Sequence, residues 1–153
     1  MPKIDLDSIE PTNATGYPAP HNAAVQGRWY RRLAPAGGLT EFGATQVVLK
    51  PGAWSSQRHW HDTEDELLVM LSGTAVLVED TGRTVLKPGD ICAWPKGNTN
   101  GHHLRNESDA ECVFVAISGG ERTGGGYSDI DMMFTAEAYL RKDGTPYAGR
   151  PAR

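Results

Sequence analysis

The sequence of 153 residues has few cysteines, no long apolar run and no surplus of basic residues. Its longest apolar runs, such as Leu67–Leu71, are far too short to cross a bilayer as a helix, which requires about 20 residues. Lysine and arginine together number 15 against 19 aspartates and glutamates, so the net charge is −4. This balance leaves no basic excess to neutralise a phosphate backbone. We therefore expect neither a membrane protein nor a nucleic-acid-binding protein.

The cysteines and the first residues of the chain indicate the compartment. The two cysteines, Cys92 and Cys112, each lie inside an apolar, strand-like run. The opening segment MPKIDLDSIEP carries acidic side chains and lacks the apolar core of a secretory signal. We expect reduced core cysteines and a cytoplasmic protein.

Glycine and proline, by contrast, are abundant, with 18 and 10 residues, and they divide the chain into short segments. From Arg28 onward, strand-like runs alternate with turn formers about every eight to twelve residues, the spacing of a sandwich or barrel. A content of 39% hydrophobic and 22% charged residues suits one globular domain. We predict an all-β barrel with strands at Trp29–Leu33, Phe42–Leu49, Ser55–Trp60, Glu66–Leu71, Thr74–Glu79, Arg83–Leu86, Ile91–Trp94, His102–Arg105 and Cys112–Ile117.

Segments of different character flank this predicted barrel of residues 28–118. Residues 1–27 contain four prolines, among them Pro11, Pro18 and Pro20, and no helical periodicity, so we expect an extended N-terminal arm. Residues 119–153 begin with a glycine-rich passage, which we interpret as a flexible loop. They continue into residues 135–142, a predicted short helix with Thr135 as its N-cap and Gly144 beyond its end.

Four of the five histidines fall into two tight groups. His59 and His61 are two residues apart and therefore share one face of a strand, with Trp60 on the other. Glu66 begins the next apolar strand, and His102 arrives from a distant one. Three imidazoles and one carboxylate can hold one divalent transition metal ion and leave coordination positions open for water or substrate. We predict that His59, His61, Glu66 and His102 form such a site.

The two stretches that carry these residues resemble the two motifs of the cupin superfamily. The first is GAWSSQRHWHDTEDELLVMLSG, and the second is GDICAWPKGNTNGHHLRN. These two stretches are similar in sequence to those of a branch of small bacterial single-domain cupins described as sugar-phosphate-isomerase-like. The resemblance covers about residues 40–118 and implies a jelly-roll β-barrel with the metal site inside it.

The second motif departs from the usual cupin pattern. Four residues separate Gly97 from the histidine pair where the usual pattern has two, so either His102 or His103 can be the ligand. The spacing from His102 to Asn106 matches the motif and favours His102. His103 would then face outward or toward the loop.

Other residues have alternative roles. Glu66 can leave the metal and act as a general base, which needs a carboxylate close to the substrate. The neighbouring acids Asp62, Glu64 and Asp65 are interpreted as a solvated turn. Ser55 and Gln57 share the face of the histidines and are candidate substrate-binding residues, although a polar barrel mouth explains them equally well. A barrel with buried, hydrogen-bonded histidines and no metal is the alternative to the whole site.

The sequence leaves several functions open. The resemblance implies a metal-dependent sugar or sugar-phosphate isomerase, but the same residues suit an oxygen-dependent enzyme or a cupin that binds a metabolite without turnover. Iron, manganese, nickel and zinc all accept this ligand set. Leu67 and Val69 face away from the site, so their strand needs cover on both sides. We expect a homodimer, with the N-terminal arm as the alternative cover.

Overall fold

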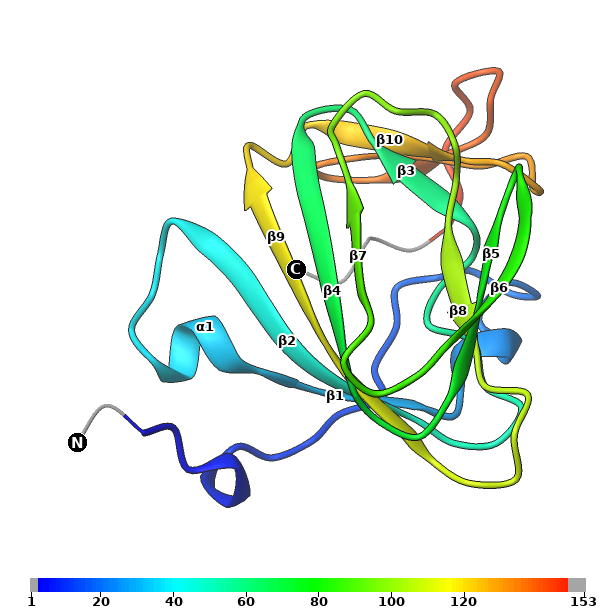
Figure 1. The fold of residues 1–153 in the computed structure, drawn as a ribbon. Helices are drawn as coiled ribbons and strands as arrows, with labels where there is room; N and C mark the ends of the chain where they lie inside the picture. The colour runs from blue at the N-terminus through cyan, green and yellow to red at the C-terminus, as the bar shows by residue number, and fades with distance from the viewer. Residues whose placement is uncertain (1–2, 149–153) are drawn as a thin grey trace.

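One large antiparallel sheet forms the frame of the computed structural model, which describes residues 3–148 (Figure 1). Its strand order is β1-β2-β9-β4-β7. The five strands are β1 (Arg28–Arg32), β2 (Phe42–Leu49), β9 (Cys112–Gly120), β4 (Glu64–Ser72) and β7 (Ile91–Trp94). The sheet is strongly curved (Figure 1).

Two smaller sheets complete the structure. A three-stranded sheet has the order β6-β5-β8, and a four-stranded sheet has the order β12-β11-β10-β3. In Figure 1 the first stands at the right, and β3 and β10 of the second cross the top. The strands are β3 (His59–His61), β5 (Ala75–Glu79), β6 (Gly82–Leu86), β8 (His103–Arg105), β10 (Gly124–Tyr127), β11 (Met133–Thr135) and β12 (Tyr139–Leu140).

Two apolar clusters hold these sheets together. The larger lies between the five-stranded and three-stranded sheets and includes Leu49, Met70, Leu77 and Phe114, each at most 6% exposed. Burying such side chains is the main favourable contribution to folding. The smaller cluster belongs to the C-terminal strands and contains two tyrosines, a phenylalanine and a methionine: Tyr127, Met132, Phe134 and Tyr139.

The mostly-β prediction is confirmed, since the structure is 44% strand and 7% helix. Each of the nine expected strands has a counterpart, although the one expected at residues 55–60 is reduced to β3, preceded by bends. The prediction of a closed barrel is wrong. Within residues 3–148 the strand pairings form three separate sheets. Both cysteines are unpaired, and Cys112 is fully buried.

The predicted C-terminal helix is also wrong, because residues 135–142 contribute to the β11–β12 hairpin. Thr135 binds backbone amides, as an N-cap would. Its hydroxyl accepts the N–H groups of Glu137 and Ala138, at 3.2 and 3.1 Å. These bonds stabilise the tight turn between two strands instead of the first turn of a helix. A threonine hydroxyl serves either structure, so the sequence pattern was ambiguous.

The glycine-rich passage is not a loop throughout, because Gly124–Tyr127 forms strand β10 between β3 and β11. A Cβ atom on Gly125 would lie 2.0 Å from the carbonyl oxygen of Trp60, and one on Gly126 would lie 2.6 Å from the Trp60 ring. Glycine is therefore required by the close approach of β3. This tertiary reason is invisible in strand propensities, which disfavour glycine.

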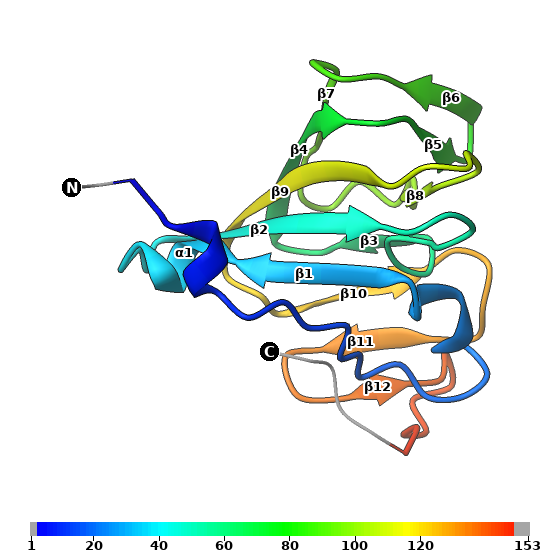
Figure 2. The same cartoon turned by 90° about the horizontal axis from the view of Figure 1, so that it is seen from below.

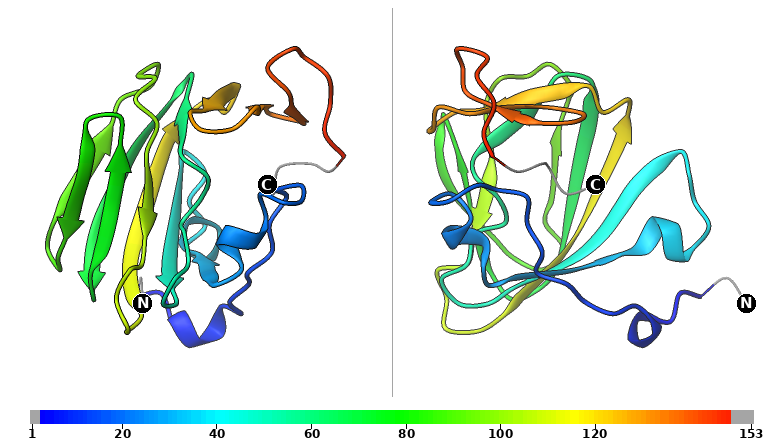
Figure 3. Two further views of the ribbon diagram at one scale, coloured as in Figure 1. Left: turned by 90° about the vertical axis from the view of Figure 1, so that its right-hand side faces the viewer. Right: turned by 180° about the vertical axis from the view of Figure 1, so that it is seen from behind.

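The N-terminal arm lies beside β1 (Figures 2 and 3). Thr12 pairs with Tyr30 of β1, with backbone bonds of 3.1 and 2.9 Å. The arm contains the short 3-10 helices Leu6–Ser8 and Ala23–Val25, and the short helix α1 (Leu33–Ala36) follows β1. Within the described part of the chain, none of the helices has the length and apolar character needed to span a membrane.

Candidate metal centre

Strand β3 places His59 and His61 side by side on one face. The strand pairs with β10, with Tyr127 opposite His59 and Gly125 opposite His61. On its other side, His59 and His102 exchange two backbone hydrogen bonds, of 3.1 and 2.9 Å. Two chain segments that are far apart in the sequence therefore meet at these histidines.

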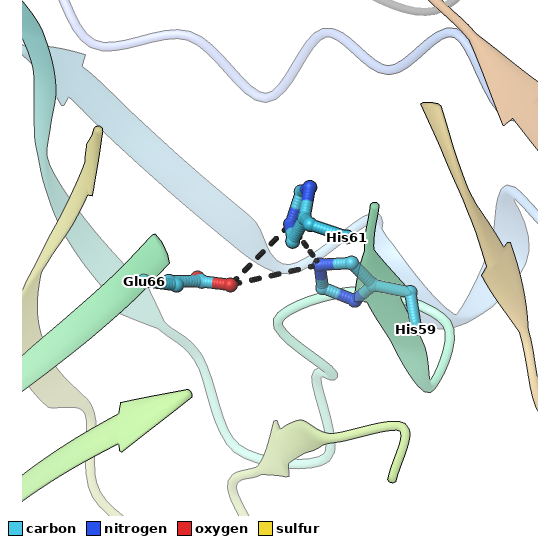
Figure 4. Close-up of side chains that lie close together, drawn as sticks. All are labelled: His59, His61 and Glu66. Atoms are coloured by element: carbon cyan, nitrogen blue, oxygen red, sulfur yellow. Dashed lines mark hydrogen bonds and ion pairs between the residues drawn. The ribbon is translucent and has the colours of Figure 1, made fainter. Parts of the chain in front are cut away.

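Glu66 of β4 faces the same point, and its Oε2 atom is the centre of the arrangement. The Nε2 atoms of His102, His61 and His59 lie 2.9, 3.4 and 3.9 Å from this oxygen. The Nε2 atoms of His59 and His61 are 3.1 Å apart. Figure 4 shows both imidazoles converging on the Glu66 carboxylate.

These distances fit a single metal ion. Two ligands of a tetrahedral ion, each about 2.0–2.1 Å from it, are about 3.3 Å apart. The donor atoms of His59, His61 and Glu66 all lie within 4.8 Å of one another. His102 is outside this group of three and joins the site through its hydrogen bond to Glu66. Three residues are thus close enough together to hold one ion, and a fourth contacts one of them.

The Nδ1 atoms of His59, His61 and His102, which point away from Glu66, each have a different environment. His59 Nδ1 lies 3.0 Å from the carbonyl oxygen of Gln57, to which it donates. His61 Nδ1 lies 3.0 Å from Oε2 of Glu64. His102 Nδ1 is buried without a partner, and its ring stacks on Trp94 at 3.8 Å. Such outer contacts fix ring orientation and direct Nε2 toward the centre.

Glu64 is a functional candidate that the sequence interpretation missed. We expected a solvated acidic turn, which is wrong for this residue because Glu64 is only 9% exposed. Strand β4 begins at Glu64, two residues before Glu66, so both carboxylates point to the same face. Extending the alternation of Glu66, Leu68 and Met70 by one step would have found it.

Burial and mutual contacts shift the pKa values in the site. Burial, with His102 nearby, lowers the pKa of His59 to about 3. Burial also opposes charge on His61, but the close carboxylates of Glu64 and Glu66 outweigh it and raise the pKa to about 9. For Glu66, hydrogen bonds from His102 and His61 outweigh burial and hold the pKa well below its usual value. Glu66 is therefore ionised, as a metal ligand must be.

His103, the alternative ligand, faces neither solvent nor the metal centre. It is 1% exposed and packs edge-on against Trp54, with ring centroids 4.8 Å apart. Its Nδ1 donates to the carbonyl oxygen of Ser56, and its Nε2 accepts from Arg105, both at 2.9 Å. With both nitrogens engaged, His103 has a structural role, which favours His102 as the ligand.

The histidines and glutamates line a cavity of about 500 Å³. This volume lies within the range of about 300–1,000 Å³ of small-molecule sites. Ser55 lines the cavity, and its hydroxyl accepts the N–H of Leu104 at 2.9 Å. Gln57 is not among the lining residues, and its side-chain amide donates to the carbonyl oxygen of His21 at 2.9 Å. It therefore ties the N-terminal arm to the loop before β3.

Tyrosines from three segments form another part of the cavity wall, which the sequence analysis did not anticipate. Tyr17 comes from the arm, Tyr127 from β10 and Tyr139 from β12. The Tyr17 ring stacks on Tyr139 and meets Tyr127 edge-on, with centroids 5.4 and 5.7 Å apart. Burial raises the pKa of all three, so their hydroxyls remain neutral hydrogen-bonding groups.

Comparison with known proteins identifies the family. A sequence model described as "Cupin domain" matches residues 45–118. A crystal structure of a sugar phosphate isomerase from a cupin superfamily, from Silicibacter pomeroyi, is 44% identical with a TM-score of 0.91. The match covers 95% of this chain and 96% of that one. The chain belongs to the cupin superfamily. Cupin domains commonly bind a metal ion.

More distant structures support the fold alone. A putative sugar phosphate isomerase from Acidithiobacillus ferrooxidans is 24% identical, with a TM-score of 0.66, covering 78% of this chain and 74% of that one. The polyketide cyclase RemF from Streptomyces resistomycificus is 19% identical, with a TM-score of 0.67, covering 85% and 87%. No curated protein sequence matches the chain significantly.

Proposed function

We propose that this cupin is a metal-dependent enzyme that acts on an oxygen-bearing small molecule, with sugar or sugar-phosphate isomerisation as the reaction class. The observation that carries the proposal is the convergence of three imidazoles on one ionised carboxylate in the cavity wall. The similarity to a sugar phosphate isomerase at 44% identity supports the reaction class.

His59, His61, Glu66 and His102 would hold the ion. A divalent transition metal supplies Lewis-acid polarisation of a bound carbonyl or hydroxyl oxygen. The contacts of His59 with Gln57 and of His61 with Glu64 keep the two rings facing the centre. Trp94, stacked on His102, is 7% exposed and keeps water from that side of the site.

Isomerisation also needs a base that moves a proton between neighbouring carbon atoms. Among the described residues that line the cavity, Glu64 and Glu66 are the carboxylates. All three histidines face Glu66, which commits it to the metal in this proposal. We therefore assign proton transfer to Glu64, whose Oε2 lies next to His61 Nδ1.

Solvent exchange tests the reaction class without knowledge of the product. Metal-loaded protein is incubated in D₂O with aldose and ketose phosphates and with the free sugars, and the carbon-bound hydrogens are followed by NMR. Proton transfer through an enediolate predicts deuterium at the carbon next to the carbonyl. Oxygen consumption without exchange would instead indicate an oxygen-dependent enzyme, and metal binding without either would indicate a binding protein.

We also propose a homodimer, formed through the outer face of the five-stranded sheet. Leu67, Leu71 and Ile91 are 36%, 49% and 65% exposed there. Within residues 3–148 the arm pairs with β1 and these three side chains remain exposed, so a second copy is the occupant that we propose. Sedimentation of the wild type should give twice the chain mass, and Ile91→Asp should give the monomer. A monomeric wild type would refute the proposal.

A further inference from the structure

Strand β1 lines the same cavity with basic side chains. Because side chains alternate along a strand, Arg28, Tyr30 and Arg32 share one face, and all three line the cavity. Trp29 and Arg31 occupy the opposite face. We call Arg28, Tyr30 and Arg32 the arginine face of β1.

The arginine face carries two positive charges: Arg28 lies 5.4 Å from the Tyr30 ring centroid, and Arg32 is exposed. Among the described residues, neither Arg28 nor Arg32 forms an ion pair with a carboxylate. Arg58, in contrast, pairs with Asp80 and with Asp129, the latter at 2.7 Å. A guanidinium without a counter-ion beside a cavity attracts an anion, and Arg matches the geometry of carboxylates and phosphates.

Arg28 also retains an unused donor. Its Nη1 donates to the carbonyl oxygen of Ser55 at 2.8 Å, and its Nη2 donates to that of Ala14 at 3.4 Å. Its Nε atom is buried and has no hydrogen-bond partner among residues 3–148. Most buried donors in native proteins are satisfied, and an unsatisfied one is costly. An oxygen atom of a ligand would supply the missing acceptor.

The register of the large sheet places the arginine face apart from the metal centre. Arg32 pairs with Thr45, Thr45 with Ala116 and Ala116 with Leu68, which is two residues from Glu66. The three strand intervals between β1 and β4 correspond to about 14 Å along the sheet. A metal ion would be neutralised by Glu64 and Glu66, which leaves the arginines as the net charge of the cavity.

We propose that the arginine face is an anion subsite, which binds a phosphate or carboxylate group of a ligand whose other end reaches the metal centre. Thr45, opposite Arg32 and also lining the cavity, adds a hydroxyl donor. Only the part of this inference that concerns the ligand's end at the metal centre rests on the proposed function. It predicts that the substrate is an acidic sugar derivative or a similar bifunctional anion and not a neutral sugar.

Calorimetric titration of the full chain with inorganic phosphate and with acetate tests this subsite. Metal is first removed with chelator, so that neither anion can bind through the ion. We expect saturable binding of at least one anion, and the stronger of the two distinguishes a phosphate from a carboxylate subsite. Arg32→Gln should weaken this binding about tenfold, because it removes a charge-assisted hydrogen bond.

Arg31→Gln is the matched control, since Arg31 lies on the opposite face of the same strand, does not line the cavity and donates to the carbonyl oxygen of Ile9 at 2.9 Å. It should leave anion binding unchanged. Arg28→Lys keeps the charge while removing Nε, and should weaken binding less than Arg32→Gln does. Absence of binding to the folded wild type, or an equal loss in Arg31→Gln, would overturn the proposal. His61→Ala should retain anion binding, so failure of the metal site is distinguishable from failure of the subsite.

Discussion

The histidine cluster (His59, His61, Glu66 and His102) and the arginine face of β1 line the same cavity but differ in how their polar groups are satisfied. In the cluster, the Nε2 atom of each imidazole lies within 3.9 Å of one carboxylate oxygen. The arginine face has no carboxylate partner within the described residues. The histidine cluster is preorganised for a cation, whereas the arginine face has hydrogen-bond donors available to a ligand. Each region therefore needs a different test.

The largest effect is expected on metal affinity when His102 is replaced, and comparison with His103 tests which of the two histidines is the ligand. His102→Ala removes a nitrogen that contacts Glu66 and should lower metal affinity more than 100-fold, beyond the roughly 10–100-fold typical of outer-contact mutations. His103→Ala is the matched control, because both nitrogens of His103 are engaged elsewhere. Metal content by mass spectrometry after dialysis measures both. Retention in His102→Ala with loss in His103→Ala would reverse the assignment.

A substitution in β10, the strand that pairs with β3, should destabilise the protein without altering a proposed metal ligand. Gly125→Ala places a methyl group against the carbonyl oxygen of Trp60 and should lower the free energy of unfolding by about 1–3 kcal/mol. Gly119→Ala is the control, since among residues 3–148 no atom beyond its two chain neighbours lies within 4 Å of the added Cβ. Chemical denaturation measures both variants. Equal stability of the two would show that β10 does not pack tightly against β3.

Glu64 links the cluster to the proposed chemistry, and two substitutions separate its roles. Glu64→Ala removes the partner of His61 Nδ1 and should weaken metal binding about 10–100-fold. Glu64→Gln keeps an oxygen acceptor, so it should retain the metal and lose deuterium exchange. Full exchange in metal-loaded Glu64→Gln would exclude Glu64 as the base and return that role to Glu66.

The smallest effect is expected on the arginine face. Tyr30→Phe removes a hydrogen bond of 3.1 Å to the carbonyl oxygen of Ala14, which should cost about 1 kcal/mol of stability. Metal content should not change, because Tyr30 has no contact with the cluster. A loss of metal in this folded variant would show that the two regions are coupled.

The sequence predicted best what local spacing determines. The i, i+2 pair His59 and His61 and the strand phase of Glu66 follow from alternation along a strand, and the order of expected strands agrees with the structure. The histidine pair separated by one residue and the turn formers are local signals, so a single sequence is sufficient to predict them.

The missed features depend on contacts between distant segments. Strand β10 consists largely of glycine because Trp60 and Phe134 approach it closely, and nothing within 124–127 indicates this. Tyr17 reaches the cavity only because the arm folds back beside β1. Glu64 is different, since its alternation with Glu66 was visible and was outweighed by the acidic neighbours on either side.

Anomalous diffraction from crystals of metal-loaded protein tests the central claim most directly. Data collected above and below the absorption edge of the bound metal locate the ion and identify its element. Our account predicts one peak within bonding distance of Nε2 of His59, His61 and His102 and of the Glu66 carboxylate. A peak elsewhere, or an empty centre with those four side chains ordered, would contradict it.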